Sequence, residues 1–287
     1  MGYKLTKEVN SEWVANSLNL PIGKLVDMVI DNVAPANKAG NRSLSFITSS
    51  KMEVSENVMY IGPTDLNLPN VLASENPRFD FIRILRNIFV EIGFDLYNFD
   101  ADIHPTVTLG QNVVIERGVR IGAGTHLDHN VVVKAGTIVG MNCFVGASTT
   151  IGSDGFGYER GLNKVPIKFV HLGGVRIEDE VEIGSLNSVV RGTLGDTILG
   201  KQVKTDNLVH IAHNCNVGEG TLITACAELS GGVEIGKNAW IAPNTSVKQK
   251  IVIGEEALIG IGAVVTRDVE SSAVVAGNPA KVLNKAK

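Results

Sequence analysis

The chain of 287 residues has few aromatic side chains, little cysteine and little net charge. Phe, Tyr and Trp make up only 5% of it, so aliphatic and small side chains must fill the core. Three cysteines, a low and odd count, argue against a disulfide framework and favour a reducing, cytoplasmic location. A net charge of −4 argues against a nucleic-acid-binding protein.

Long hydrophobic runs are missing as well. The sequence has no stretch of 18 apolar residues, so we expect no transmembrane helix. Residues 1–10 are a mixture of polar and charged residues, and they lack the apolar segment of a signal peptide. The composition therefore predicts a globular protein of the cytoplasm.

What the chain has instead is 31 glycines and a repeat of six residues. Every sixth residue from Ile103 to Ile151 is aliphatic. The pattern resumes at Ile177 and, after one shift of frame, runs from Leu199 to Val265, where only Thr205 is not aliphatic. The residue two positions before each of these is usually small or β-branched.

An α-helix cannot explain this period, because 3.6 residues per turn would wind the apolar stripe around the rod. Short strands joined by tight corners fit it, with three hexads forming one triangular coil. A single coil cannot bury its own interior, so the coils must stack, about 4.8 Å apart. The repeat predicts a mainly β fold, a parallel β-helix of roughly eight coils.

Residues 1–100 lack the repeat and are predicted to form a separate α/β module. Residues 44–47, 58–61 and 70–73 have the pattern of short strands. Asn76 and Pro77 are typical of a helix start, and two apolar stripes predict a helix over 77–92 that is covered on two sides. We expect a β-helix domain over 101–270 and a tail over 271–287.

The repeat is interrupted once by a long segment, a loop over residues 152–176. It is far too long for a corner. Long excursions from a regular solenoid tend to carry function, so this loop is a candidate substrate-binding element.

The spacing also singles out His213, which follows Ile211 by two residues and should lie at a corner. Gly231 occupies the equivalent place on the next coil, about 5 Å away. An imidazole can take a proton near neutral pH, and the N–H of an adjacent glycine can stabilise an oxyanion. Either Asn214 or Asp206 could orient His213.

Other catalytic chemistry is less favoured. Cys143 and Cys215 occupy the small inward position, where thiols act as apolar filler. No two histidines are spaced by one whole coil within the repeat, so we expect no metal site.

Five segments give the chain a family resemblance: 44–51, 73–77, the loop segment 154–158, 191–200, and 206–214 with its Ile-Ala-His-Asn sequence. Together they resemble the UDP-3-O-acylglucosamine N-acyltransferases of lipid A synthesis. This resemblance implies a left-handed β-helix and a homotrimer with active sites between adjacent subunits. It also implies that His213 is the general base, that Gly231 is the oxyanion donor and that Phe46 stacks on the nucleotide base. The other implied substrate-binding residues are Asp154, Phe156, Tyr158, Asp206, Asn207, His210 and Asn214.

Several positions depart from the family pattern. Met52 replaces a tyrosine, Val190 an aspartate and Lys250 a second histidine. We expect no C-terminal helical extension of the kind with which the family engages acyl carrier protein. Residues 277–281 resemble instead the coenzyme A edge of sugar acetyltransferases, which makes Lys250, Asn278 and Lys281 candidate contacts for coenzyme A.

These departures favour an N-acyltransferase that uses acyl-CoA, and no metal, to acylate a dTDP- or UDP-linked deoxyamino sugar for a surface glycan. Two alternatives stay open. One is the lipid A enzyme itself, with acyl carrier protein as the donor. The other is a β-helix protein that is non-catalytic or acts as a metal hydrase.

Overall fold

The computed structural model describes residues 2–49, 51–66, 68–161 and 163–283. The chain divides into two compact units, each considered by itself. An N-terminal unit combines Met1–Leu96 with Gly157–Leu172, and a β-helix unit combines Tyr97–Phe156 with Gly173–Lys287. The two helices are short, and no helix in the described ranges is long and apolar enough to span a bilayer.

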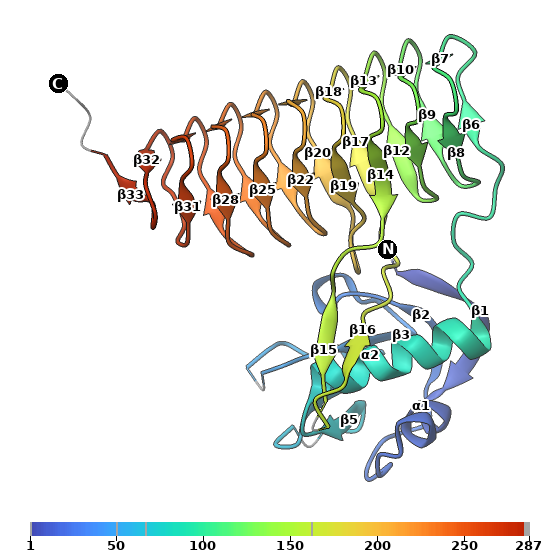
Figure 1. Cartoon of the computed structure of the whole chain (residues 1–287). Coiled ribbons are helices and arrows are strands. Elements are labelled where there is room, and N and C mark those ends of the chain that lie inside the picture. Colours follow the sequence, from blue (N-terminus) through green and yellow to red (C-terminus); the bar gives the residue numbers. More distant parts are fainter. Residues whose placement is uncertain (1, 50, 67, 162, 284–287) are drawn as a thin grey trace. The chain divides into compact units, whose positions relative to one another are not determined.

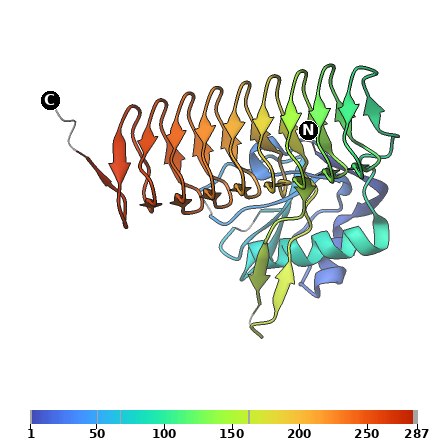
Figure 2. The same cartoon turned by 45° about the horizontal axis from the view of Figure 1, so that its top comes forward.

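The β-helix unit consists of three parallel sheets whose short strands alternate along the chain, seen as stacked coils from green to red in Figures 1 and 2. Sheets II and III have eight strands each, in agreement with the predicted number of coils. Sheet I has a ninth parallel strand and, at one edge, the antiparallel β33 (Lys281–Val282).

The strands of sheet I are β7 (Thr108–Leu109), β10 (His126–Leu127), β13 (Phe144–Val145), β18 (Glu182–Ile183), β21 (Lys204–Thr205), β24 (Leu222–Ile223), β27 (Trp240–Ile241), β30 (Leu258–Ile259), β32 (Val274–Ala276) and β33 (Lys281–Val282). Sheet II contains β8 (Val114–Ile115), β11 (Val132–Val133), β14 (Thr150–Ser153), β19 (Ser188–Val190), β22 (His210–Ile211), β25 (Glu228–Leu229), β28 (Ser246–Val247) and β31 (Val264–Val265). Sheet III contains β6 (Asp102–Ile103), β9 (Arg120–Ile121), β12 (Thr137–Val139), β17 (Val175–Ile177), β20 (Thr197–Leu199), β23 (Asn216–Val217), β26 (Glu234–Ile235) and β29 (Val252–Ile253).

The repeated aliphatic residues point into the rod as predicted. Leu127, Val145 and Ile183 stack in register along sheet I and are buried. The exceptions are Ile103 and Leu109, which are 36% and 47% exposed. They belong to the first coil, which has a neighbouring coil on one side only.

Thr205, the polar member of the repeat, has a buried polar partner. The Nδ2 group of Asn187, one coil earlier, donates to Thr205 Oγ1 at 3.1 Å and to the carbonyls of Gly184 and Asp206 at 2.9 Å each. Asn187 Oδ1 accepts from the Val209 N–H, and the Asn187 N–H donates to Thr149 Oγ1. These bonds satisfy polar groups inside the rod, next to a coil that is longer than the coil after it.

The N-terminal unit has a five-stranded sheet in the order β1-β2-β3-β4-β5. The strands are β1 (Tyr3–Asn10), β2 (Val29–Val33), β3 (Ser43–Phe46), β4 (Val58–Pro63) and β5 (Val71–Ser74). Its helices are α1 (Ser11–Leu18), the 3₁₀ turn η1 (Ala36–Lys38) and α2 (Pro77–Asn87), which continues into the π-helical η2 (Ile88–Ile92). The three predicted strands and the helix are confirmed, whereas β1, α1 and β2 were not predicted.

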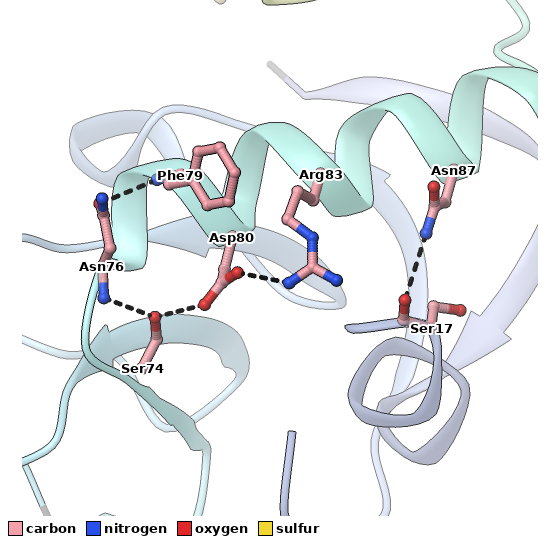
Figure 3. Close-up of polar contacts among 7 residues, drawn as sticks. All are labelled: Ser17, Ser74, Asn76, Phe79, Asp80, Arg83 and Asn87. Atoms are coloured by element: carbon pink, nitrogen blue, oxygen red, sulfur yellow. Dashed lines mark hydrogen bonds and ion pairs between the residues drawn. The ribbon is translucent and has the colours of Figure 1, made fainter. Parts of the chain in front are cut away.

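The start of α2 is fixed by side chains, shown in Figure 3. Asn76 Oδ1 accepts from the Phe79 N–H at 3.2 Å, which satisfies a free helix donor. Ser74 Oγ donates to Asp80 at 2.6 Å and accepts from the Asn76 N–H at 3.0 Å. Arg83 donates to the other oxygen of Asp80 at 2.8 Å. The same helix is thereby tied to the end of β5.

The inserted loop forms a hairpin of β15 (Tyr158–Arg160) and β16 (Pro166–Lys168) that packs on α2. Glu159 pairs with Arg78 at 2.7 Å, and the Phe169 ring lies 6.3 Å from that of Phe81. Residues 157–172 therefore belong to the N-terminal unit, which differs from the predicted assignment of the loop 152–176 to the β-helix domain.

The predicted tail over 271–287 also differs. Val275 of β32 pairs with Ile259 of β30, so the last coil extends through Ala276. The apolar side chain of Val275 continues the core, and this explains why the coil does not end at 270. Residues 284–287 of that tail lie outside the described residues.

We predict that Asn187→Ala lowers the free energy of unfolding by about 1–3 kcal/mol, because buried carbonyls and N–H groups lose their partner. Urea titration monitored by circular dichroism measures the change. The control is Asn216→Ala on the exposed face of sheet III, which should change stability by less than about 0.5 kcal/mol. An Asn187 variant as stable as this control would show that the buried network contributes nothing.

Candidate active site

The two irregularities of the repeat, the long insertion and the shift of frame, lie at one corner of the rod. At this corner the chain passes from sheet II to sheet III. We call it the site corner: Ala135–Gly136, the ends of the insertion at Ser153 and Gly173, Arg191–Asp196, His213–Asn214, Gly231–Gly232 and Gln249–Lys250. The insertion leaves after β14 and returns before β17. An extended turn over 191–196 joins β19 to β20 on the next coil. His213 follows on the coil after that.

The imidazole of His213 lies against Gly231 on the neighbouring coil, as the spacing predicts. A Cβ atom on Gly231 would meet His213 Cε1 at 2.5 Å and Nε2 at 2.7 Å. The coils are joined there by a 2.9 Å hydrogen bond from the Gly232 N–H to the His213 carbonyl. Positive φ is found at Gly232 but not at Gly231, so position 231 needs glycine for space, not for backbone conformation.

Asn214 holds the ring of His213 in place. Its Oδ1 lies 3.1 Å from His213 Nδ1 and accepts from the Thr193 N–H at 3.2 Å and the Thr193 hydroxyl at 2.8 Å. Its Nδ2 donates to the Gly195 carbonyl at 3.2 Å. The Asn214 N–H donates to Thr197 Oγ1 at 2.9 Å.

These contacts determine which nitrogen of His213 carries the proton. A backbone N–H can only donate and a carbonyl can only accept, so the two backbone partners of Asn214 fix the orientation of its amide. Oδ1 then accepts from His213 Nδ1, which must carry the hydrogen. The lone pair of the neutral ring is therefore on Nε2, which with Cε1 is one of the two ring atoms nearest to Gly231.

Asp206, the other candidate for orienting His213, lies elsewhere. It precedes β22 at the corner between sheets I and II, where its Oδ1 accepts from the Asn207 N–H at 2.7 Å. Asn207 Oδ1 accepts from the Ser185 N–H on the coil before. Both side chains are exposed, and His210 lies between them and His213, on the outer face of sheet II. Asn214 is thus the residue that contacts the imidazole.

Arg191 anchors the site corner, a role that the sequence reasoning missed. Its Nε donates to the Gly173 carbonyl at 2.8 Å and its Nη2 to the Ala135 carbonyl at 2.7 Å. The guanidinium lies 5.5 Å from the centre of the Tyr97 ring. Burial raises the pKa of Tyr97, although Arg191 opposes this shift. One side chain therefore joins the coils on both sides of the insertion.

The predicted nucleotide and sugar contacts are divided between the units. Phe46 ends β3 in the N-terminal unit, where its half-buried ring lies 4.7 Å from that of Phe81. Tyr158 lies on β15 of the same unit and is 45% exposed. Asp154 and Phe156 belong to the β-helix unit, on the segment that leaves the rod, and Phe156 is 89% exposed.

Of the predicted coenzyme A contacts, only Lys250 lies at the site corner. Its N–H donates to the Gly231 carbonyl at 3.0 Å, and its side chain is exposed one coil beyond Gly231. Asn278 and Lys281 lie at the end of sheet I, with Lys281 on β33. The structure does not bring these two residues to the site corner.

The cysteines have the environments expected of packing residues. Burial raises the pKa of Cys215 to about 12 and also raises that of Cys143, whereas Cys226 is exposed. Within the described ranges, no three His, Cys, Asp or Glu side chains are grouped to hold a metal ion.

Comparison with known proteins bears out the resemblance. Residues 118–153 match the model of the bacterial transferase hexapeptide family (six repeats). The UDP-3-O-acylglucosamine N-acyltransferase of Campylobacter lari is 37% identical over 127 residues, 44% of this chain and 40% of that protein. The enzyme of the same name from Delftia acidovorans is 37% identical over 125 residues, 44% of this chain and 37% of that protein. The chain thus matches about two fifths of the length of these relatives.

Solved structures show the fold. A crystal structure of UDP-N-acetylglucosamine acyltransferase superposes with a TM-score of 0.59 at 24% identity, over 64% of this chain and 69% of that one. The protein LpxA from Acinetobacter baumannii gives 0.54 at 25%, over 64% and 71%. The fold is the left-handed β-helix of the hexapeptide acyltransferases, combined here with a small N-terminal α/β unit.

We predict that a maleimide labels Cys226 rapidly at pH 8 in the folded protein and leaves Cys143 and Cys215 unmodified. Only the thiolate reacts, and the raised pKa of both buried thiols leaves little of it at that pH. Mass spectrometry of tryptic peptides distinguishes the three sites, and unfolding in urea should expose all of them. Equal labelling in the folded state would contradict the burial of these thiols.

Proposed function

We propose that this chain transfers an acyl group from a thioester to the amino group of a nucleotide-linked sugar. The observation that carries the proposal is the contact of the His213 imidazole with Gly231 on the next coil. This contact lies at the site corner, where the insertion and the extended turn over 191–196 also lie. The names of the relatives, all N-acyltransferases, support the same reaction class.

The geometry suits attack of an amine on a thioester. Asn214 holds the Nδ1–H of His213, so Nε2 is the atom that takes the proton from the acceptor nitrogen. A general base of this kind contributes about 10²–10⁴-fold to the rate. The Gly231 N–H is the proposed donor to the oxyanion of the tetrahedral intermediate.

The relatives favour UDP-3-O-acylglucosamine as the acceptor, because this sugar is in their name. The corresponding donor is an acyl carrier protein thioester. In this proposal Phe46 stacks on the uracil ring, and Asp154, Phe156, Tyr158, Asp206, Asn207 and His210 contact the substrate. The active sites lie between the subunits of a homotrimer.

A second candidate uses acyl-CoA and a dTDP- or UDP-linked deoxyamino sugar. The exposed ammonium of Lys250 at the site corner favours it, because a lysine can meet coenzyme A phosphates as a point charge. Asn278 and Lys281 are the further proposed contacts of this cofactor. The exposed Met52, in place of the family's tyrosine, indicates a different nucleotide environment.

Thermal melting with separate additions of UDP, dTDP and coenzyme A decides between these candidates. A ligand at 100 times its Kd stabilises the folded state by about 2.7 kcal/mol. We expect UDP to raise the melting temperature. A rise with coenzyme A as well supports the acyl-CoA donor, and a rise with dTDP in place of UDP supports the second candidate. A protein that responds to none of the three would contradict both.

Product formation tests the reaction itself, by mass spectrometry on a panel of nucleotide-linked amino sugars with acyl-CoA and acyl carrier protein thioesters. We predict that His213→Ala lowers kcat about 10²–10⁴-fold. Gly231→Ala should lower it about 100-fold, because its methyl group would displace the imidazole.

The control for the glycine variant is Gly40→Ala, whose methyl group would enter open space. Its kcat should equal that of the wild type. Size-exclusion chromatography and circular dichroism establish that each variant keeps its assembly and fold. Normal turnover by His213→Ala would remove this residue from the mechanism.

A further inference from the structure

Glu228 lies on the outer face of sheet II, on the strand that leads to Gly231 at the site corner. Strand β25 pairs with β22 on one side and β28 on the other, so Glu228 is in register with His210 and Ser246. Residues in register on neighbouring coils are about 4.8 Å apart. Glu228 is therefore one coil away from His210 and three positions before Gly231.

A hydrogen bond holds the carboxylate of Glu228 toward the site corner. Ser230 Oγ donates to its two oxygens at 3.0 and 3.3 Å, and Ser230 immediately precedes Gly231. The Ser230 carbonyl accepts from Cys215 Sγ at 3.3 Å, two residues beyond His213. Ser230, which positions the carboxylate, thus contacts the coil that contains His213.

The charge of Glu228 has no counter-ion in the described part of the chain. Other glutamates on the rod, such as Glu116, Glu182 and Glu219, pair with a lysine at 2.7–3.0 Å. No such pair is found for Glu228 among the described residues, although its side chain is half-buried. A carboxylate that is partly removed from water gains most from a positive charge brought to it.

We propose that Glu228 is a specificity-determining residue that stabilises the positive charge on the acceptor nitrogen, and so selects an amine over a hydroxyl. The inference rests on the proposed function, N-acyl transfer at His213. It assigns to this site an acceptor whose nitrogen is neutral when it attacks and cationic once it has bonded to the thioester carbon.

The charge balance of the step explains why a carboxylate helps. The nitrogen lone pair forms a bond to the thioester carbon, and the C=O π electrons move to the oxygen, which the Gly231 N–H stabilises. The nitrogen then carries a positive charge until His213 Nε2 takes its proton. The C–S electron pair leaves with the thiolate, which receives that proton from the imidazolium. Glu228 stabilises the cationic nitrogen after it has bonded to the thioester carbon and before His213 takes its proton.

The experiment compares Glu228→Gln with Glu234→Gln, which removes a carboxylate from the exposed outer face of sheet III on the same coil. Each protein receives the acceptor and thioester that give product with the wild type. A second assay replaces the acceptor by its analogue with a hydroxyl in place of the amine. Glu228→Gln should lower kcat/KM for the amine about 10–100-fold and change the hydroxyl reaction little. Glu234→Gln should match the wild type.

Equal amine preference in Glu228→Gln and Glu234→Gln would overturn the inference while leaving the proposed function intact. Failure of the wild type to acylate any amine would instead overturn the proposed function, and this inference with it. Ser230→Ala keeps the carboxylate but removes its hydrogen bond, so it serves if Glu228→Gln does not fold. It should lower the preference for the amine several-fold, and an unchanged preference would also contradict the proposal.

Discussion

The register between coils is the constraint on which the rest of the molecule depends. Backbone hydrogen bonds such as that from the Gly110 N–H to the Leu127 carbonyl fix each residue opposite its counterpart on the next coil. A slip by one residue would turn every inward aliphatic side chain to the outside. The same register places Gly231 beside His213 and Glu228 beside His210. Stability and the candidate chemistry therefore depend on one ladder.

The irregular turns at the site corner have side-chain anchors in addition to backbone hydrogen bonds such as that from the Gly173 N–H to the Thr193 carbonyl. Arg191 binds carbonyls of Gly173 and Ala135, and Asp196 accepts from the Gly174 N–H at 2.8 Å. The backbones approach so closely that a Cβ on Gly173 would lie 2.1 Å from the Gly195 carbonyl oxygen. Asn214 completes this set and also contacts His213. The residues that hold the turns thus also orient the proposed base.

The repeat could be predicted from the sequence because its signal is periodic, and it gave the fold class, the coil number and the pairing of His213 with Gly231. The partner of Thr205 could not, since Asn187 is a polar exception at a position that is usually small or β-branched, and only the folded core shows which groups its amide contacts. The placement of the insertion could not be predicted either. Its packing on α2 depends on contacts such as that between Glu159 and Arg78, which are far apart in sequence. Arg191 was part of a recognised segment, but its role needs the carbonyls that only the folded turns bring together.

An amide at position 214 suits a site that already contains Glu228. A carboxylate there would hold the same Nδ1–H but would also stabilise an imidazolium, which has no lone pair to accept a proton. The Asn214 amide orients the ring without adding negative charge. Glu228 lies instead on the neighbouring coil, where it can act on the acceptor nitrogen rather than on the ring. The separation of these two tasks, orientation by a neutral group and charge stabilisation by a carboxylate, favours a neutral imidazole that takes a proton from a nitrogen made cationic by its attack.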